Sequence, residues 1–208
     1  MQFMKGKRTF GESKNLKNYI EDNLSKEEYD QLQNSSKEIV VAVTNITKNC
    51  VEYKSILECC YEDFCDWIWI SCNYIPFMSL VTKNRFEYAD GGISNVIPIQ
   101  EAINRGATEI DVIVLETEQN TSEKVIGKNP FSLTIDLFGT IIDQVERKDI
   151  IIGRLAAAAK NVKLNFYYTP TKLTDNPLVF NKKLMHDWWH QGYEYAKNKS
   201  ETMSQIQI

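Results

Sequence analysis

The segment that decides the fold reads Arg-Phe-Glu-Tyr-Ala-Asp-Gly-Gly-Ile-Ser-Asn-Val-Ile-Pro at residues 85–98. Residues 85–89 predict a short strand, and the glycine pair that follows predicts a sharp turn. Pro98 is suited to the first position of a helix, and Gly106 is suited to its end. Residues 109–116 are almost continuously apolar and predict a second strand. This order predicts a βαβ unit with parallel pairing and a right-handed crossover.

The flanking sequence alternates helices and strands, without an internal repeat or a linker. Ser25 and Glu28 form a capping box, which predicts the start of a short helix. Alternating strands and helices indicate a single layered α/β domain. The other expected elements are helices near residues 16–24 and 25–33, a buried strand at 38–46 with a hairpin partner at 50–56, helices at 58–73 and 134–147, a strand at 163–169 and a closing helix at 181–199. Residues 150–160 are expected to form a second helix or a kinked extension of the helix at 134–147.

Composition excludes several classes of protein. The 208 residues are 43% hydrophobic and 25% charged, as in ordinary globular domains, and the formal net charge of −4 argues against nucleic-acid binding. No apolar run approaches the roughly 20 residues of a membrane span, and no secretory signal follows the N-terminus. The five cysteines lack Cys-x-x-Cys spacing, which argues against a zinc site and favours free thiols in the cytoplasm.

Asp90 is the candidate chemical group, because it follows a strand directly and precedes Gly91 and Gly92. Ligands and catalytic groups collect outside the carboxyl ends of strands in open α/β sheets. Paired glycines allow a positive φ there, and the carboxylate would accept a proton from a hydroxyl nucleophile. The alternative is a plain turn, since Asp-Gly is a common turn dipeptide.

The wider pattern resembles the second half of a patatin-like phospholipase domain, most densely over residues 38–115. The family pattern is a Ser-x-x-x-Pro segment, a strand ending in Asp-Gly-Gly, an Asn-x-Pro helix start and Ala-x-x-x-Gly-Ala before the next strand. In this sequence the Ser–Pro and Asn–Pro spacings are each one residue longer. The corresponding runs here are Ser71-Cys72-Asn73-Tyr74-Ile75-Pro76, Tyr88-Ala89-Asp90-Gly91-Gly92-Ile93, Asn95-Val96-Ile97-Pro98-Ile99 and Ala102-Ile103-Asn104-Arg105-Gly106-Ala107.

The resemblance implies a three-layer α/β/α sandwich and hydrolysis of carboxylic esters by a Ser-Asp dyad. It gives Asp90 the role of general base, with Gly91 and Gly92 shaping its turn. It further implies a lipid or acyl-ester substrate, hence a role in lipid degradation, and leaves room for peripheral membrane contact in the complete enzyme. It implies no cofactor and no metal, because a dyad and backbone donors suffice for acyl transfer.

The sequence departs from the family in its nucleophile. None of the nine glycines brackets a serine as Gly-x-Ser-x-Gly, and no glycine-rich oxyanion loop is present. Residues 1–208 are therefore expected to be the C-terminal part of the domain, without its N-terminal third and inactive alone. That absence would leave unpaired N–H and C=O groups along the strand at 85–90. We therefore expect them to be covered by the chain's own N-terminal segment, by another chain or by the rest of a longer polypeptide. A non-catalytic interaction or regulatory domain on the same scaffold, or an unrelated α/β binding protein, are the alternatives.

Two further groups of side chains are weaker candidates. His186 and His190 have zinc-binding spacing, but without a third ligand an exposed helix face is the better interpretation. An aromatic and apolar set suits either an acyl-chain pocket or ordinary core packing. Its members are Trp67, Trp69, Phe77 and Met78.

Overall fold

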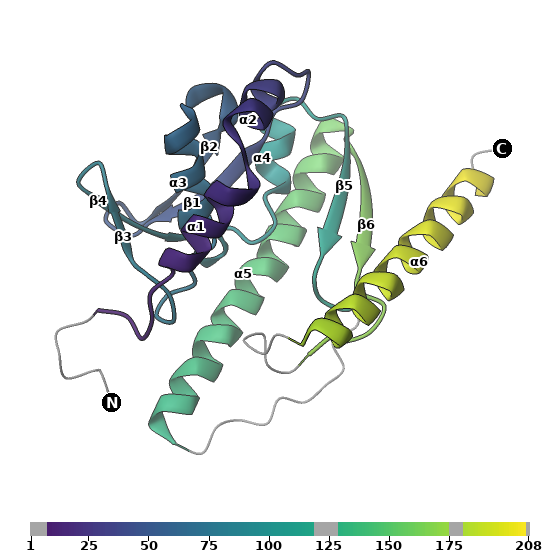
Figure 1. The fold of residues 1–208 in the computed structure, drawn as a ribbon. Coiled ribbons are helices and arrows are strands. Elements are labelled where there is room, and N and C mark those ends of the chain that lie inside the picture. The colour runs from purple at the N-terminus through teal and green to yellow at the C-terminus, as the bar shows by residue number, and fades with distance from the viewer. Residues whose placement is uncertain (1–7, 119–128, 175–180, 207–208) are drawn as a thin grey trace. The chain divides into compact units, whose positions relative to one another are not determined.

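The computed structural model describes residues 8–118, 129–174 and 181–206, and it is a mixed α/β fold (Figure 1). The chain divides into two compact units. Unit 1 comprises Met1–Pro98 and Lys128–Gly153, and unit 2 comprises Ile99–Gly127 and Arg154–Ile208. The long helix α5 (Pro130–Lys160) contributes residues to both units. Residues 134–147 and 150–160, the second of which was expected as a separate helix or a kinked extension, thus lie in one continuous helix.

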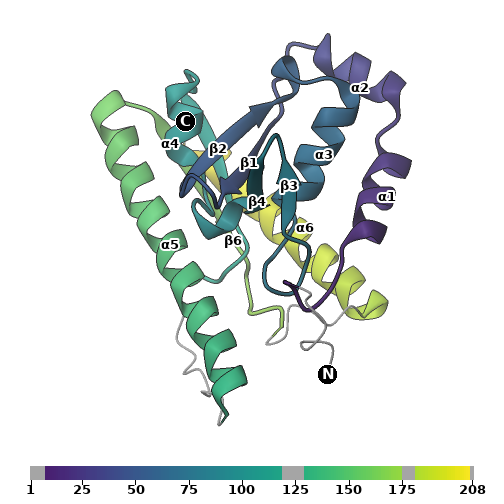
Figure 2. The same cartoon turned by 90° about the vertical axis from the view of Figure 1, so that its left-hand side faces the viewer.

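Unit 1 is built around a four-stranded antiparallel sheet in the order β2-β1-β4-β3. Helix α3 packs on this sheet, and α1 packs on α3 (Figure 2). The unit contains α1 (Lys14–Asn23), α2 (Lys26–Gln33), β1 (Val40–Asn45), β2 (Cys50–Ser55), a 3-10 helix (Ile56–Glu58), α3 (Tyr61–Ser71), β3 (Val81–Lys83), β4 (Phe86–Asp90) and a second 3-10 helix (Gly91–Ile93).

Among the described residues, two clusters of buried side chains from α2, α3, the sheet and the first 3-10 helix form the core of unit 1. One cluster joins Val43, Trp67, Ile70 and Tyr88, and the other joins Tyr29, Ile56 and Phe64. Phe64 and Ile56 are almost completely buried. Burying apolar surface at about 25 cal/mol per Å² is the main force that holds α3 on the sheet.

In its described residues, unit 2 contains a two-stranded parallel sheet, two helices and the C-terminal end of α5. Strands β5 and β6 pair in register from Glu109↔Lys163 to Val114↔Tyr168. Gly106 has φ +94° and ends α4, where Ala107 N–H donates to the Ala102 carbonyl, as predicted. The elements are α4 (Ile99–Asn104), which begins directly after Pro98, β5 (Glu109–Val114), β6 (Lys163–Tyr168) and α6 (Lys182–Ile206).

The structure corrects one prediction about β4. It was expected to pair in parallel with β5, and that expectation is wrong. Its edges, which were expected to be covered by the chain's own N-terminal segment, another chain or a longer polypeptide, are covered from within the chain. Strand β4 pairs with β1 through Val43↔Asp90 and with β3 through Val81↔Tyr88, both antiparallel. Because a strand has only two edges and β1 and β3 occupy them, β5 pairs with β6 instead.

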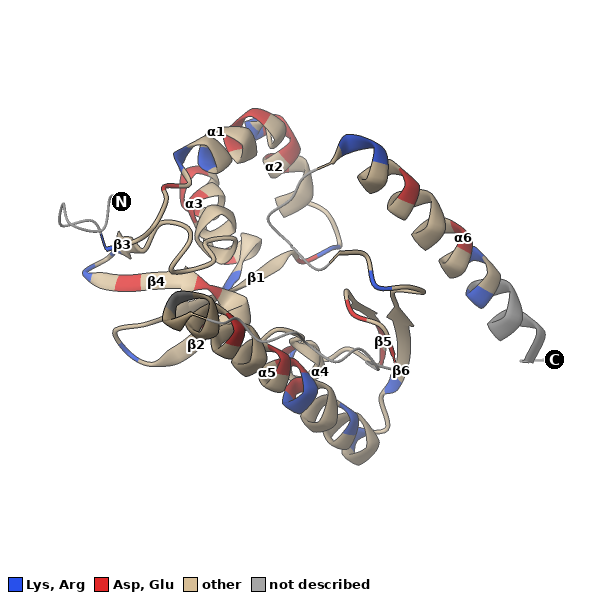
Figure 3. Ribbon diagram, turned by 90° about the horizontal axis from the view of Figure 1, so that it is seen from below, with Lys and Arg blue, Asp and Glu red and all other residues tan. Residues whose placement is uncertain are grey.

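Lys and Arg residues are interspersed with Asp and Glu along α5 and α6 (Figure 3). This distribution agrees with the acidic overall balance and gives neither helix a purely basic face. Within the described residues, no helix combines the length and the apolar character needed to cross a membrane.

Candidate active site at the Asp90 turn

A tight hairpin and a central strand pairing deliver Asp90 to its position. Asn84 and Arg85 have φ of 53° and 68°, which lets two residues connect β3 to β4 with the twist that antiparallel strands need. At the other end of β4, Asp90 lies opposite Val43 of β1. Asp90 is therefore the last paired residue of a central strand and stands at its carboxyl end, as the sequence predicts.

The turn after β4 is closed by the Asp90 side chain itself. Asp90 Oδ1 accepts a hydrogen bond from Gly92 N–H at 2.7 Å. The Gly91 carbonyl then accepts from Ser94 N–H at 3.0 Å and from Asn95 N–H at 2.9 Å. The side chain thus caps the 3-10 helix Gly91–Ile93, as an aspartate does at an ordinary turn.

Gly91 is required for a different reason from the one that the sequence suggested. A positive φ was expected at the glycine pair, but Gly106 is the glycine with positive φ among the described residues. At Gly91 a Cβ atom would lie 2.3 Å from the Ala42 carbonyl oxygen of β1. Gly92 is less constrained, because its Cβ would lie 3.1 Å from Asp90 Oδ1 and 3.9 Å from a methyl group of Val96.

The backbone of Asp90 is held from two sides. Its N–H donates to the Asn73 carbonyl at 3.0 Å, and its carbonyl accepts from Thr44 Oγ1 at 2.8 Å. Asn73 is itself completely buried, and its Nδ2 donates to the Trp69 carbonyl at 2.7 Å. Thr44 and Asn73 thus fix the position from which the carboxylate extends.

The Asp90 carboxylate is partly buried and keeps one oxygen open. Burial raises the pKa of Asp90, and the hydrogen bond from Gly92 N–H offsets only part of that rise. Among the described residues Oδ2 has no hydrogen-bond partner, and it is not sealed from solvent. A carboxylate with a raised pKa and a free oxygen has the two properties that a general base needs.

The charge of Asp90 acts on two neighbouring side chains. Burial raises the pKa of the Cys72 thiol and of the Tyr74 hydroxyl, and the negative charge of Asp90 raises both further. Asp143 contributes to the shift at Tyr74. Both groups therefore stay protonated at neutral pH, so neither provides an anionic nucleophile beside Asp90.

The weaker candidates take structural roles or remain apart. Trp67 lies in the core, in agreement with ordinary packing as opposed to an acyl-chain pocket. Phe77 stacks on Phe10 and Tyr74. His186 and His190 are exposed on α6, as expected. Within the described part of the chain, no three metal-binding side chains gather in one place.

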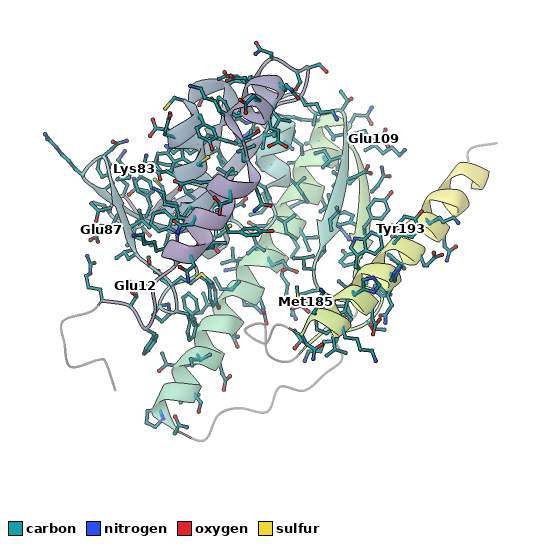
Figure 4. The ribbon with its side chains drawn as sticks, in the orientation of Figure 1. Glu12, Lys83, Glu87, Glu109, Met185 and Tyr193 are labelled. Atoms are coloured by element: carbon teal, nitrogen blue, oxygen red, sulfur yellow. The ribbon has the colours of Figure 1, made fainter. Side chains whose placement is uncertain are left out.

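Unit 2 has a separate apolar groove of about 860 Å³ between its parallel sheet and α6. Ile113 and Leu115 are 73% and 78% exposed on the strand side, and Met185 and Tyr193 lie on the α6 side (Figure 4). Among the described lining residues Asp111 is the charged one, and its Oδ1 accepts from Asn165 Nδ2 at 2.9 Å. The groove therefore offers apolar surface. Asp90, the general-base candidate, is not among its described lining residues.

Sequence reasoning identified Asp90 and its glycines, but not the residues that hold them. Thr44 and Asn73 stand 46 and 17 positions before Asp90, and Asp149 on α5 reaches the same loop from 59 positions after it. No local pattern marks a partner of this kind. Of these three partners, Asn73 alone lay in a quoted motif, the run Asn73-Tyr74-Ile75-Pro76.

Neither the scan against protein-family models nor the search of curated proteins returned a match for this chain.

Proposed function

We propose that this chain supplies the general base of a patatin-like lipid acyl hydrolase, with Asp90 as the base. The observation that carries the proposal is a partly buried carboxylate with an open Oδ2 at the carboxyl end of β4. The motif resemblance over residues 38–115 supports it further. In this proposal the chain is the C-terminal part of a three-layer α/β/α sandwich.

The serine of the proposed dyad is not among these 208 residues, because they contain no Gly-x-Ser-x-Gly. Asp90 Oδ2 accepts the serine proton while the serine oxygen attacks the ester carbonyl carbon. Collapse of the adduct expels the alcohol, which takes the proton back from Asp90. Water then attacks the acyl-serine while Asp90 accepts one of its protons. Asp90 passes that proton to the departing serine oxygen, and a fatty acid leaves.

The isolated chain provides the first test. We expect no turnover of p-nitrophenyl esters above background and no labelling by a fluorophosphonate probe, which reacts with activated serines. Turnover that disappears in Asp90→Ala would show that a nucleophile exists within these residues and would overturn the proposed division of the dyad.

The decisive test uses the polypeptide encoded in frame through the codons before Met1. We expect a Gly-x-Ser-x-Gly motif there, fluorophosphonate labelling, and a loss of about 10⁴- to 10⁶-fold in turnover for Asp90→Asn. Asp30→Asn is the matched control, because Asp30 is an exposed carboxylate on α2. A stop codon directly upstream, or full turnover in Asp90→Asn, would favour the non-catalytic alternative.

A further inference from the structure

Asp149 on α5 collects three hydrogen bonds from the loop that follows the Asp90 turn. Its Oδ1 accepts from Asn95 Nδ2 at 2.9 Å. Its Oδ2 accepts from Val96 N–H at 2.7 Å and from Ile97 N–H at 3.2 Å. Both carboxylate oxygens are therefore used, and both point at one three-residue segment.

The same segment is connected to the turn itself. Asn95 N–H donates to the Gly91 carbonyl at 2.9 Å, so Asn95 touches the turn through its backbone and Asp149 through its side chain. Asn95 Oδ1 also accepts from Tyr53 Oη of β2 at 3.1 Å. A continuous network thus runs from β2 through Asn95 to α5, with the Asp90 turn attached to its middle.

Asp149 is not an exposed surface carboxylate that meets the loop incidentally. Burial raises its pKa, and the hydrogen bonds from Ile97, Val96 and Asn95 oppose that rise. Hydrogen bonds to an ionised acceptor are shorter and stronger than neutral ones, which gives this carboxylate a firm hold on the backbone. The neighbouring residue Lys148 is exposed and has no comparable role.

We propose that Asp149 is the positioning residue of the Asp90 turn, and this rests on the function proposed above. By holding residues 95–97 it keeps Gly91 and Gly92 in place, so that Gly92 N–H stays on Asp90 Oδ1 and Oδ2 stays open. Asp149 acts through the loop and does not touch the reacting atoms. Without it, the downstream side of the turn loses its anchor, while Thr44 and Asn73 still hold Asp90 on the upstream side.

The test is a pH titration of the full chain by amide NMR, with Gly92 N–H as the reporter of Asp90 ionisation. In Asp149→Ala we expect Val96 and Ile97 to exchange about 10- to 100-fold faster, since each loses a charge-assisted hydrogen bond. We also expect the Gly92 midpoint to move to higher pH, because a weaker Gly92 N–H bond favours the ionised form of Asp90 less. A Gly92 midpoint unchanged while Val96 and Ile97 exchange faster would show a purely structural role and overturn the proposal.

Two further variants sharpen the result. In Asp149→Asn the amide oxygen still accepts from Val96 and Ile97, and Asn95 can turn its amide over to face the new Nδ2. We expect the wild-type Gly92 midpoint there, as in the control Gln144→Ala, an exposed position on α5. A midpoint shifted in Asp149→Asn as far as in Asp149→Ala would contradict anchoring by these hydrogen bonds.

If Asp149→Ala does not fold, Asn95→Ala decides, because it removes one of the three hydrogen bonds and the link to Tyr53. We expect a smaller shift of the Gly92 midpoint in the same direction, and no shift would overturn the proposal. These measurements need no turnover. If the hydrolase proposal is wrong, the Gly92 midpoints still shift as expected and only the turnover tests fail. If the Asp149 proposal is wrong, the Gly92 midpoints do not shift as expected, whatever the turnover tests show.

Discussion

Replacing Gly91 by alanine tests the close approach of β1 to the Asp90 turn. The added Cβ would lie 2.3 Å from the Ala42 oxygen and 2.6 Å from the Ala42 carbonyl carbon, whereas ordinary contact begins at 3.4 Å. Ala42 cannot easily retreat, because it is paired with Tyr53 on the other side of β1. Relief therefore requires a shift of the turn by about 1 Å away from β1.

Such a shift strains the hydrogen bond from Thr44 Oγ1 to the Asp90 carbonyl. Overpacking costs about 1–3 kcal/mol and a lost neutral hydrogen bond about 0.5–1.5 kcal/mol, so we expect Gly91→Ala to lower the free energy of unfolding by about 3 kcal/mol. With a urea dependence of about 2 kcal/mol per M, the midpoint falls by about 1.5 M.

Urea unfolding followed by tryptophan fluorescence measures this, since Trp67 lies in the core beside Tyr88. Gly92→Ala is the matched control, because its Cβ would approach only the end of the Asp90 side chain, at 3.1 Å. We expect the control to lose less than about 1 kcal/mol. Equal losses in the two variants would refute the argument that backbone contact with β1 selects glycine at position 91.

Three further outcomes follow from single residues. Burial raises the pKa of Asp90, so folding disfavours its ionised form and the stability of the wild type falls as pH rises through the folded-state pKa. We therefore expect Asp90→Asn to be more stable than wild type at pH 7 but not at pH 3, as measured by thermal melts. Ser25→Ala removes the bond to Glu28 N–H and lowers stability by about 1 kcal/mol, so an unchanged melt would contradict the cap. Phe64 is 1% exposed, and we expect Phe64→Ala to lower the free energy of unfolding in urea by about 3–5 kcal/mol. Leu57 is 53% exposed, and an equal loss in Leu57→Ala would contradict the core role of Phe64.

The sequence predicts those parts of the fold that depend on near neighbours. The capping box of Ser25 and Glu28 is confirmed, and so are the helix end at Gly106 and the pairing of residues 50–55 with 40–45. Each depends on residues a few positions apart, where side-chain type and backbone preference fix the geometry together. Asp90 is placed for the same reason, because a strand followed by a glycine pair is a local pattern.

The partners of β4 could not be predicted in this way. Each of its two edges can pair with one strand, and several strands in the chain could do so. In the structure β1 and β3 occupy the two edges. The apolar run at 109–114 is equally compatible with pairing to β4 or to β6, because a strand pattern specifies which faces are buried and not which strand lies alongside. Asp149 was missed on the same ground, since nothing in its own surroundings indicates a loop some fifty positions earlier.

The geometry of Asp90 bears directly on the choice between a plain turn and a functional carboxylate. A plain turn needs only an acceptor for Gly92 N–H, and an asparagine supplies one without a charge. The chain instead keeps a carboxylate where burial raises its pKa, so its ionised form at neutral pH costs folding free energy. Groups with such shifts are concentrated at functional sites, although structural networks also produce them. The Asp90→Asn comparison separates the two roles, because it keeps the acceptor and removes the charge. Greater stability at pH 7 in that variant would mean that the charge is retained for something other than the turn.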